Sequence, residues 1–163
     1  MVDAPEGLLI AWHSRTGASR AMARAAADGA GEHARLMRAA DVLPEDVLAS
    51  AAYLFVCPEN LASMSGEMKE MFDRCYYPVL GKVEGRAYAT LIAAGSDGEG
   101  AQRQIDRIAT GWRLRRVAGP VIFNFDAQTP EAILAEKAVS EARLAQCREL
   151  GAALAEGIAL GLF

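Results

Sequence analysis

The residues best suited to chemistry in this sequence are three hydroxyl side chains around one glycine: Ser14, Thr16, Gly17 and Ser19. They follow the apolar run 8–12 and precede an alanine-rich segment, as expected of a buried strand that turns into a helix. The first turn of a helix has backbone N–H groups without partners and the positive end of the helix dipole. Such a turn binds anions, above all phosphate, and hydroxyl groups add donors. A turn whose hydroxyl groups only cap the helix has the same residue types, so the motif alone leaves both interpretations open.

Two more loops with small residues follow apolar runs. The first is 58–69, in which Pro58 is expected to end the strand and Ala62, Ser63 and Gly66 allow the main chain to approach a flat ligand closely. The other is the glycine-rich turn 95–100, which also fits an ordinary turn before a helix.

The order of apolar runs and amphipathic segments predicts an α/β fold. Strands are expected at 7–12, 34–37, 52–57, 87–94 and 117–124, and helices at 18–30, 44–50, 67–76, 101–110 and 129–160. Gly29 and Gly31 are expected to stop the first helix. This alternation predicts a three-layer, doubly wound fold with a five-stranded parallel sheet of order 2-1-3-4-5. In that order the strands before the three loops are neighbours, so the loops meet at the carboxyl edge of the sheet, where ligands bind in such folds.

Composition excludes several classes of function. The 163 residues are expected to form a single domain, 1–163, and 52% of them are hydrophobic. A net charge of −4 argues against a nucleic-acid partner. No apolar run has the length of a membrane span, and the first residues do not form a signal peptide. Three cysteines without paired spacing favour the cytoplasm, and with only two histidines we expect no metal site.

The second loop resembles a known family. Its residues Pro58, Glu59, Asn60, Ser63, Gly66 and Lys69 match the post-strand loop of the NAD(P)H-dependent FMN reductases in the flavodoxin-like superfamily. The first loop looks like the phosphate loop of flavodoxins. The chain departs from the reductases at Ser65, where they usually have proline, and at Asn60-Leu61, where they usually have Tyr-Asn.

This resemblance implies a flavodoxin-like fold that binds FMN, with NAD(P)H as co-substrate or a redox protein as partner. The implied cofactor-binding residues are Ser14, Arg15, Thr16, Gly17, Ala18, Ser19, Pro58, Glu59, Asn60, Leu61, Ala62, Ser63, Met64, Gly95, Ser96, Asp97 and Gly98. No catalytic side chain is expected, because the hydride chemistry belongs to the flavin. A flavodoxin-type electron carrier and a domain without enzymatic activity are the alternatives, and a homo-oligomer is left open.

Overall fold

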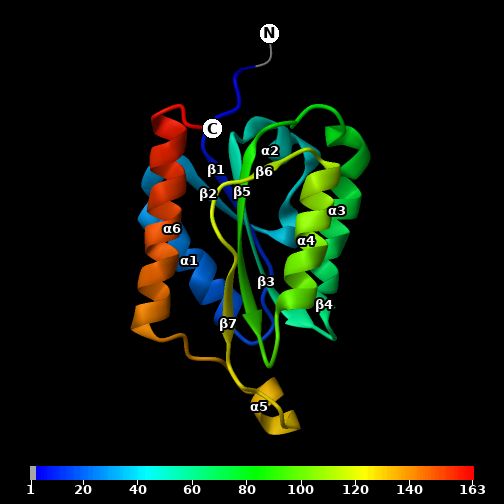
Figure 1. Cartoon of the computed structure of the whole chain (residues 1–163), viewed down its shortest axis with the longest axis vertical. Helices are drawn as coiled ribbons and strands as arrows, with labels where there is room; N and C mark the ends of the chain where they lie inside the picture. The colour runs from blue at the N-terminus through cyan, green and yellow to red at the C-terminus, as the bar shows by residue number, and fades with distance from the viewer. Residues whose placement is uncertain (1–2) are drawn as a thin grey trace.

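The computed structural model describes residues 3–163, which are arranged around one β-sheet (Figure 1). Parallel strands lie side by side in the order β2 (Ala34–Arg38), β1 (Leu8–Trp12), β3 (Ala52–Asn60) and β5 (Ala87–Ala94). Two short strands, β6 (Arg115–Arg116) and β7 (Val121–Asn124), both pair with the far edge of β5. Together they take the place of a fifth strand, so the predicted order 2-1-3-4-5 is confirmed.

Helices cover both faces of this sheet (Figure 1). One face is covered by α1 (Ala18–Ala30) and α6 (Glu141–Ala159), and the other by α3 (Gly66–Val79) and α4 (Glu99–Gly111), with the short α2 (Pro44–Ala49) beside them. The central strands are apolar over most of their length because they pack against helices on both sides. The predicted three-layer, doubly wound α/β fold is therefore confirmed.

A glycine in each helix lets α1 and α6 cross at close range. A Cβ built on Gly151 would lie 1.9 Å from the carbonyl oxygen of Ala26, and one built on Gly29 would lie 2.0 Å from that of Arg148. Gly29 lies within α1, one residue before its end, so the expectation that it stops the helix together with Gly31 was wrong for Gly29. The helix ends at Ala30, and the C-cap residue Gly31 has a φ of 69°, a positive value that glycine adopts without strain.

The segment 129–160 is not the single long helix that its pattern predicts. It forms a short helix, α5 (Pro130–Leu134), and then α6, separated by residues 135–140. These residues run past the turn after β1, where the backbone N–H of Lys137 donates a hydrogen bond of 2.8 Å to the carbonyl oxygen of Thr16. The prediction missed the start of α6, although Ser140, whose Oγ accepts the N–H of Arg143, is an N-cap residue that the sequence displays.

Strand β3 is longer than predicted. It runs past Pro58 and turns back as β4 (Ser63–Met64), whereas the sequence pattern ends the strand at Pro58. Strand β1 pairs with β3 only as far as Val56, so one edge of β3 is free beyond it and a residue without an N–H is tolerated there. The turn 61–62 has φ angles of 52° and 62°, a left-handed conformation that is strained for residues other than glycine.

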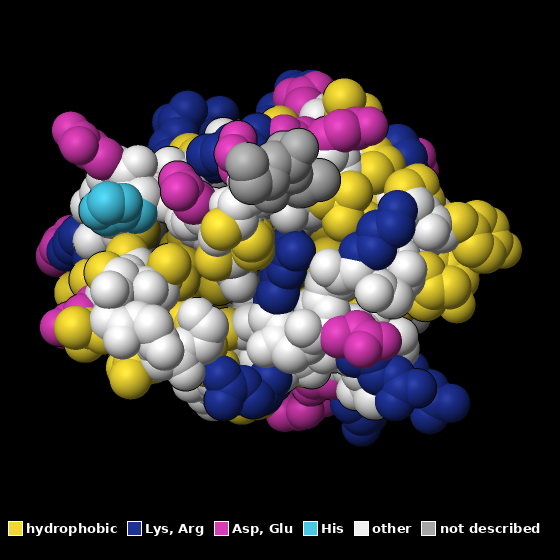
Figure 2. Space-filling view, turned by 90° about the horizontal axis from the view of Figure 1, so that it is seen from above, with side chains coloured by type: hydrophobic (Ala, Val, Ile, Leu, Met, Phe, Trp, Pro, Cys, Tyr) yellow, Lys and Arg dark blue, Asp and Glu magenta, His cyan; other side chains and the backbone are white. Residues whose placement is uncertain are grey.

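Figure 2 shows the end of the molecule opposite the carboxyl ends of the strands. Hydrophobic surface lies over the ends of α3 and α6, where the exposed large side chains include Tyr77, Leu80, Leu160 and Leu162. Charged side chains of both signs lie between these areas. Within residues 3–163, no helix has both the length and the apolar character needed to cross a membrane.

Candidate functional site

The turn between β1 and α1 has the geometry of an anion site. Gly17 precedes the first residue of α1 with a φ of 97°, a left-handed conformation that glycine adopts without strain. Its N–H donates a 3.1 Å hydrogen bond to Oγ of Ser14. The N-cap position offers no side-chain acceptor to the first turn of α1, so N–H groups and the positive end of the helix dipole face the carboxyl edge of the sheet.

Ser19, in the first turn of α1, carries an unsatisfied hydroxyl group. Its residue is 1% exposed, and its Oγ is the buried side-chain polar atom that lacks a hydrogen-bond partner within the described part of the chain. Burial of a hydroxyl group without a partner costs about 1–3 kcal/mol, so each such group calls for an explanation. Its position at the start of α1 fits a hydrogen bond to an oxygen of an anionic ligand.

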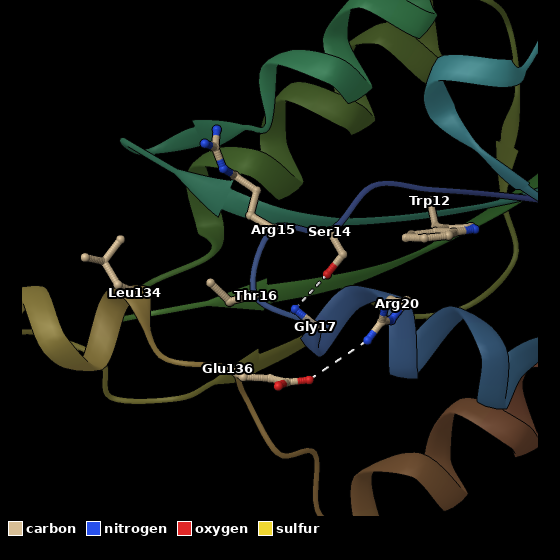
Figure 3. A pocket seen from close by; sticks show the side chains of 8 residues that line it. All are labelled: Trp12, Ser14, Arg15, Thr16, Gly17, Arg20, Leu134 and Glu136. Carbon is tan, nitrogen blue, oxygen red and sulfur yellow. Dashed lines mark hydrogen bonds and ion pairs between the residues drawn. The ribbon is translucent and has the colours of Figure 1, made fainter.

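A cavity of about 300 Å3 opens beside this turn (Figure 3). Its lining residues are Trp12, Ser14, Arg15, Thr16, Gly17, Arg20, Leu134 and Glu136. Figure 3 shows Glu136 extending from the segment after α5 toward Arg20, with 3.9 Å between Oε1 and Nη2. Glu136 is largely exposed and Arg20 is about half exposed, so this ion pair is weak and the Arg20 guanidinium is able to turn toward an anion.

Sequence reasoning missed four of these lining residues. Arg20 directly follows Ser19 and lies on the exposed side of α1, so its position in the first helical turn was a usable signal. Trp12 is the last residue of β1. Leu134 and Glu136 belong to a segment that reaches the turn only through the tertiary fold, and no local pattern reveals that approach.

A buried histidine joins the first predicted loop to the second. Nδ1 of His13 lies 2.8 Å from Oγ of Ser65, and its Nε2 lies 3.2 Å from a carboxylate oxygen of Glu67. Burial lowers the pKa of His13, the Glu67 carboxylate opposes this shift, and Arg15 adds to it. A neutral imidazole therefore connects the end of β1 to the start of α3.

The predicted residues 58–64 form the hairpin of β3 and β4. Glu59 pairs with Met64 and Asn60 with Ser63, while Leu61 at the tip is fully exposed. These residues lie outside the lining of the 300 Å3 cavity. The hairpin therefore borders a different part of the carboxyl edge from the anion site.

The third predicted loop, 95–98, lies directly against this hairpin. The carboxylate of Glu59 accepts hydrogen bonds from the backbone N–H groups of Gly98 and Ala101, at 2.8 and 3.0 Å. Asp97 accepts a longer one, of 3.3 Å, from the N–H of Glu99, and Ser96 is exposed. The structure thus brings the three predicted loops to one edge of the sheet. His13 connects the first loop to the second, and Glu59 connects the second to the third.

Cys57 lies on β3 just before the second loop, but it is not suited to nucleophilic chemistry. Its side chain is fully buried, and burial raises the pKa of the thiol to about 12. The thiolate, which is the reactive form, is therefore scarce at neutral pH. The site therefore provides hydrogen-bond donors and a cavity for a ligand, and Cys57 adds no reactive group to it.

Comparison with known proteins identifies relatives of the chain. The family described as NADPH-dependent FMN reductase matches residues 39–129, more than half of the chain. A flavodoxin from Aquifex aeolicus (strain VF5) is 28% identical over 162 residues, which cover 94% of this chain and 87% of the relative.

Solved structures share the fold at lower identity. A flavodoxin from the domain Archaea superposes with a TM-score of 0.76 at 17% identity, covering 94% of this chain and 99% of the other. A WrbA-like flavodoxin protein from Agrobacterium tumefaciens also gives 0.76, at 18% identity, covering 95% and 98%. The fold is therefore flavodoxin-like.

Proposed function

We infer that this chain, which belongs to the NADPH-dependent FMN reductase family, is an oxidoreductase that takes electrons from NADH or NADPH and passes them to a second acceptor. FMN is its cofactor. When bound, FMN supplies the hydride-accepting and electron-transferring chemistry, and the protein supplies binding, orientation and electrostatics.

The observation that carries the FMN-binding part of this proposal is the buried, unpartnered Oγ of Ser19. It lies at a helix start with unpaired N–H groups, and Arg20 lines the cavity beside it. Hydroxyl groups, N–H groups and a guanidinium are the donors that a phosphate requires. The residues therefore fit the phosphate of FMN, and we propose that Ser14, Thr16, Gly17 and Ser19 hold it.

The flavin ring is proposed to lie against the second and third loops, 58–64 and 95–98. Backbone groups in such loops can hydrogen-bond the polar edge of a flat ring, which would orient it without any charged side chain. Neither loop contains an aromatic residue. A ring without an aromatic side chain stacked on it from these loops leaves a face open to a nicotinamide, which supports the reductase assignment.

The test is anaerobic reduction of the FMN-loaded protein by NADPH and by NADH, followed by absorbance. Rapid bleaching of the bound-flavin spectrum is the expected result, and the faster nucleotide is the preferred donor. Oxidised NADP+ at the same concentration is the control and should leave the spectrum unchanged. Failure of both reduced nucleotides to bleach bound FMN contradicts the proposal.

A flavodoxin-type electron carrier is the second candidate, favoured by the 28% identity to the Aquifex flavodoxin along nearly the whole chain. A carrier receives its electrons from a protein. Its bound FMN would be reduced by dithionite but by neither nucleotide. Protein that stays colourless after addition of FMN would overturn both candidates.

We further propose that the chain works as one domain in the cytoplasm. Its three cysteines, Cys57, Cys75 and Cys147, are all buried and unpaired, which suits a reducing compartment. The electron acceptor is either a small molecule or a partner protein, and steady-state assays with both classes would distinguish them.

A further inference from the structure

The carboxylate of Glu59 has an unusual position at the start of α4. The residue lies on β3, yet its Oε1 accepts a hydrogen bond from the N–H of Gly98 and its Oε2 one from the N–H of Ala101. It thus serves as the cap of a helix from a different element, because the N-cap position itself offers no side-chain acceptor. Within residues 3–163, Glu59 forms no ion pair with a basic side chain.

The hairpin that carries Glu59 is also pressed against α4. A Cβ built on Gly100 would lie 2.1 Å from the carbonyl oxygen of Ala62, so only glycine permits this approach. On β4, Oγ of Ser63 and the N–H of Met64 both donate to Oε1 of Gln104, at 2.8 Å each. The strained turn 61–62 is therefore held between contacts on both strands, as expected where the surroundings impose an unfavourable conformation.

We propose that Glu59 is a positioning residue for the flavin ring. Its carboxylate fixes the start of α4 against the β3–β4 hairpin, so that the two loops proposed to hold the ring keep one arrangement before the ring binds. Preorganisation of this kind raises affinity because the loops need not be ordered on binding. The inference rests on the proposed function only in placing the ring at these loops.

The chemistry of the contact requires a carboxylate. Two backbone donors point at two acceptor oxygens, and a glutamine can offer only one oxygen while its NH2 group faces the other N–H. Glu59→Gln therefore leaves one N–H unpaired and separates the loops with little change in side-chain volume. Gly100→Ala is an independent way to separate them, because the added methyl group collides with the hairpin backbone.

The experiment measures dissociation constants of FMN and of riboflavin, which lacks the phosphate, by flavin fluorescence. We expect E59Q and G100A to weaken the binding of both flavins by a similar factor, so that each dissociation constant rises roughly tenfold. Both variants should also shift the visible absorption bands of bound FMN, because the loops border the ring. S19A should weaken the binding of FMN alone and leave the bands unchanged, because its hydroxyl group is proposed to bind the phosphate.

The matched control is Glu99→Gln. Glu99 is an exposed acid in the first turn of the same helix, so its removal makes the same charge change without separating the loops. We expect E99Q to bind both flavins as the unsubstituted protein does. Binding at the unsubstituted affinity by E59Q and G100A, or loss of FMN affinity alone, would overturn the role of Glu59. Absence of FMN binding by the unsubstituted protein would instead overturn the proposed function.

Discussion

At Ser19, stability and ligand binding make opposite demands on one atom. The buried Oγ lacks a partner, so it costs free energy in the protein without ligand. Ser14, five residues earlier in the chain, differs because its Oγ already accepts the N–H of Gly17. Two serines of the same motif should therefore respond differently to loss of their hydroxyl groups.

Ser19→Ala should leave the free energy of unfolding of the FMN-free protein unchanged, or raise it by up to about 1 kcal/mol, because an unsatisfied hydroxyl group is removed. The same substitution should weaken FMN binding roughly tenfold to hundredfold, since a hydrogen bond to a charged phosphate is lost. Urea unfolding and fluorescence titration measure the two effects. Ser14→Ala is the comparison, and it should lower the free energy of unfolding by about 1 kcal/mol.

His13 should make the stability of the fold depend on pH. Burial lowers its pKa below the ordinary 6.5, so the unfolded chain takes up a proton near pH 6.5 while the folded chain does not. The unfolded state then binds more protons, and the free energy of unfolding falls as the pH drops from 6.5 to the folded pKa. Below the folded pKa this contribution stays constant.

His13→Asn removes this titration, so its free energy of unfolding should decrease less than that of the unsubstituted protein on acidification. Urea unfolding at about pH 7.5 and about pH 5.5 measures the difference between the two proteins. Other groups titrate equally in both proteins and cancel in the comparison. A parallel pH dependence in the two proteins would contradict a lowered pKa for His13.

At the scale of elements, the crossing of α1 and α6 depends on two residues that lack side chains. Gly151→Ala should destabilise the fold by about 1–3 kcal/mol or more, because the new methyl group meets the backbone of Ala26 and both helices must move apart. Chemical denaturation of the variant measures the loss as a lower denaturation midpoint.

Gly111→Ala is the matched control for this prediction. Gly111 also lies in a helix, but a Cβ there would meet no atom within 4 Å. Alanine has the higher helix propensity, so this variant should be neutral or more stable by up to about 1 kcal/mol. Equal losses from both substitutions would mean that close packing is not what Gly151 provides.

The elements that sequence could predict are those with strong local signals. Helix α1 was predicted at both ends because an alanine-rich segment lies between Gly17 and Gly31. The apolar runs of β1 and β5 were equally clear. The break at 135–140 was missed, and the hydrogen bond from Lys137 to Thr16 within it joins residues that are far apart in the chain.

At the scale of the whole molecule, a bound ligand should stabilise the fold through contacts with distant segments. FMN at about one hundred times its dissociation constant should add about 2.7 kcal/mol to the free energy of unfolding. For a chain of this size, that corresponds to a rise in Tm of about 5–10 °C, measured by circular dichroism. The same FMN concentration should raise the Tm of S19A by less, and an unchanged Tm in the unsubstituted protein would contradict binding.

The site was predictable in part, because topology fixes which loops meet. Three loops after neighbouring strands must share the carboxyl edge, and the structure places them there. The wall formed by Leu134 and Glu136 was not predictable, because it depends on how a distant segment packs. Nor could the sequence show that the Glu59 carboxylate faces α4, since side-chain direction follows from the hairpin that extends β3.

The pairing of α1 with α6 has a consequence for synthesis on the ribosome. Residues 18–30 are made long before residues 141–159, so the alanine face of α1 leaves the exit tunnel without the helix that covers it. Residues 135–140, which contact Thr16 through Lys137, are also translated late. A nascent chain that ends before α6 therefore exposes apolar surface that chaperones recognise, and Leu134 and Glu136, which form one wall of the anion site, are still inside the exit tunnel. Cofactor loading should accordingly follow translation of α6.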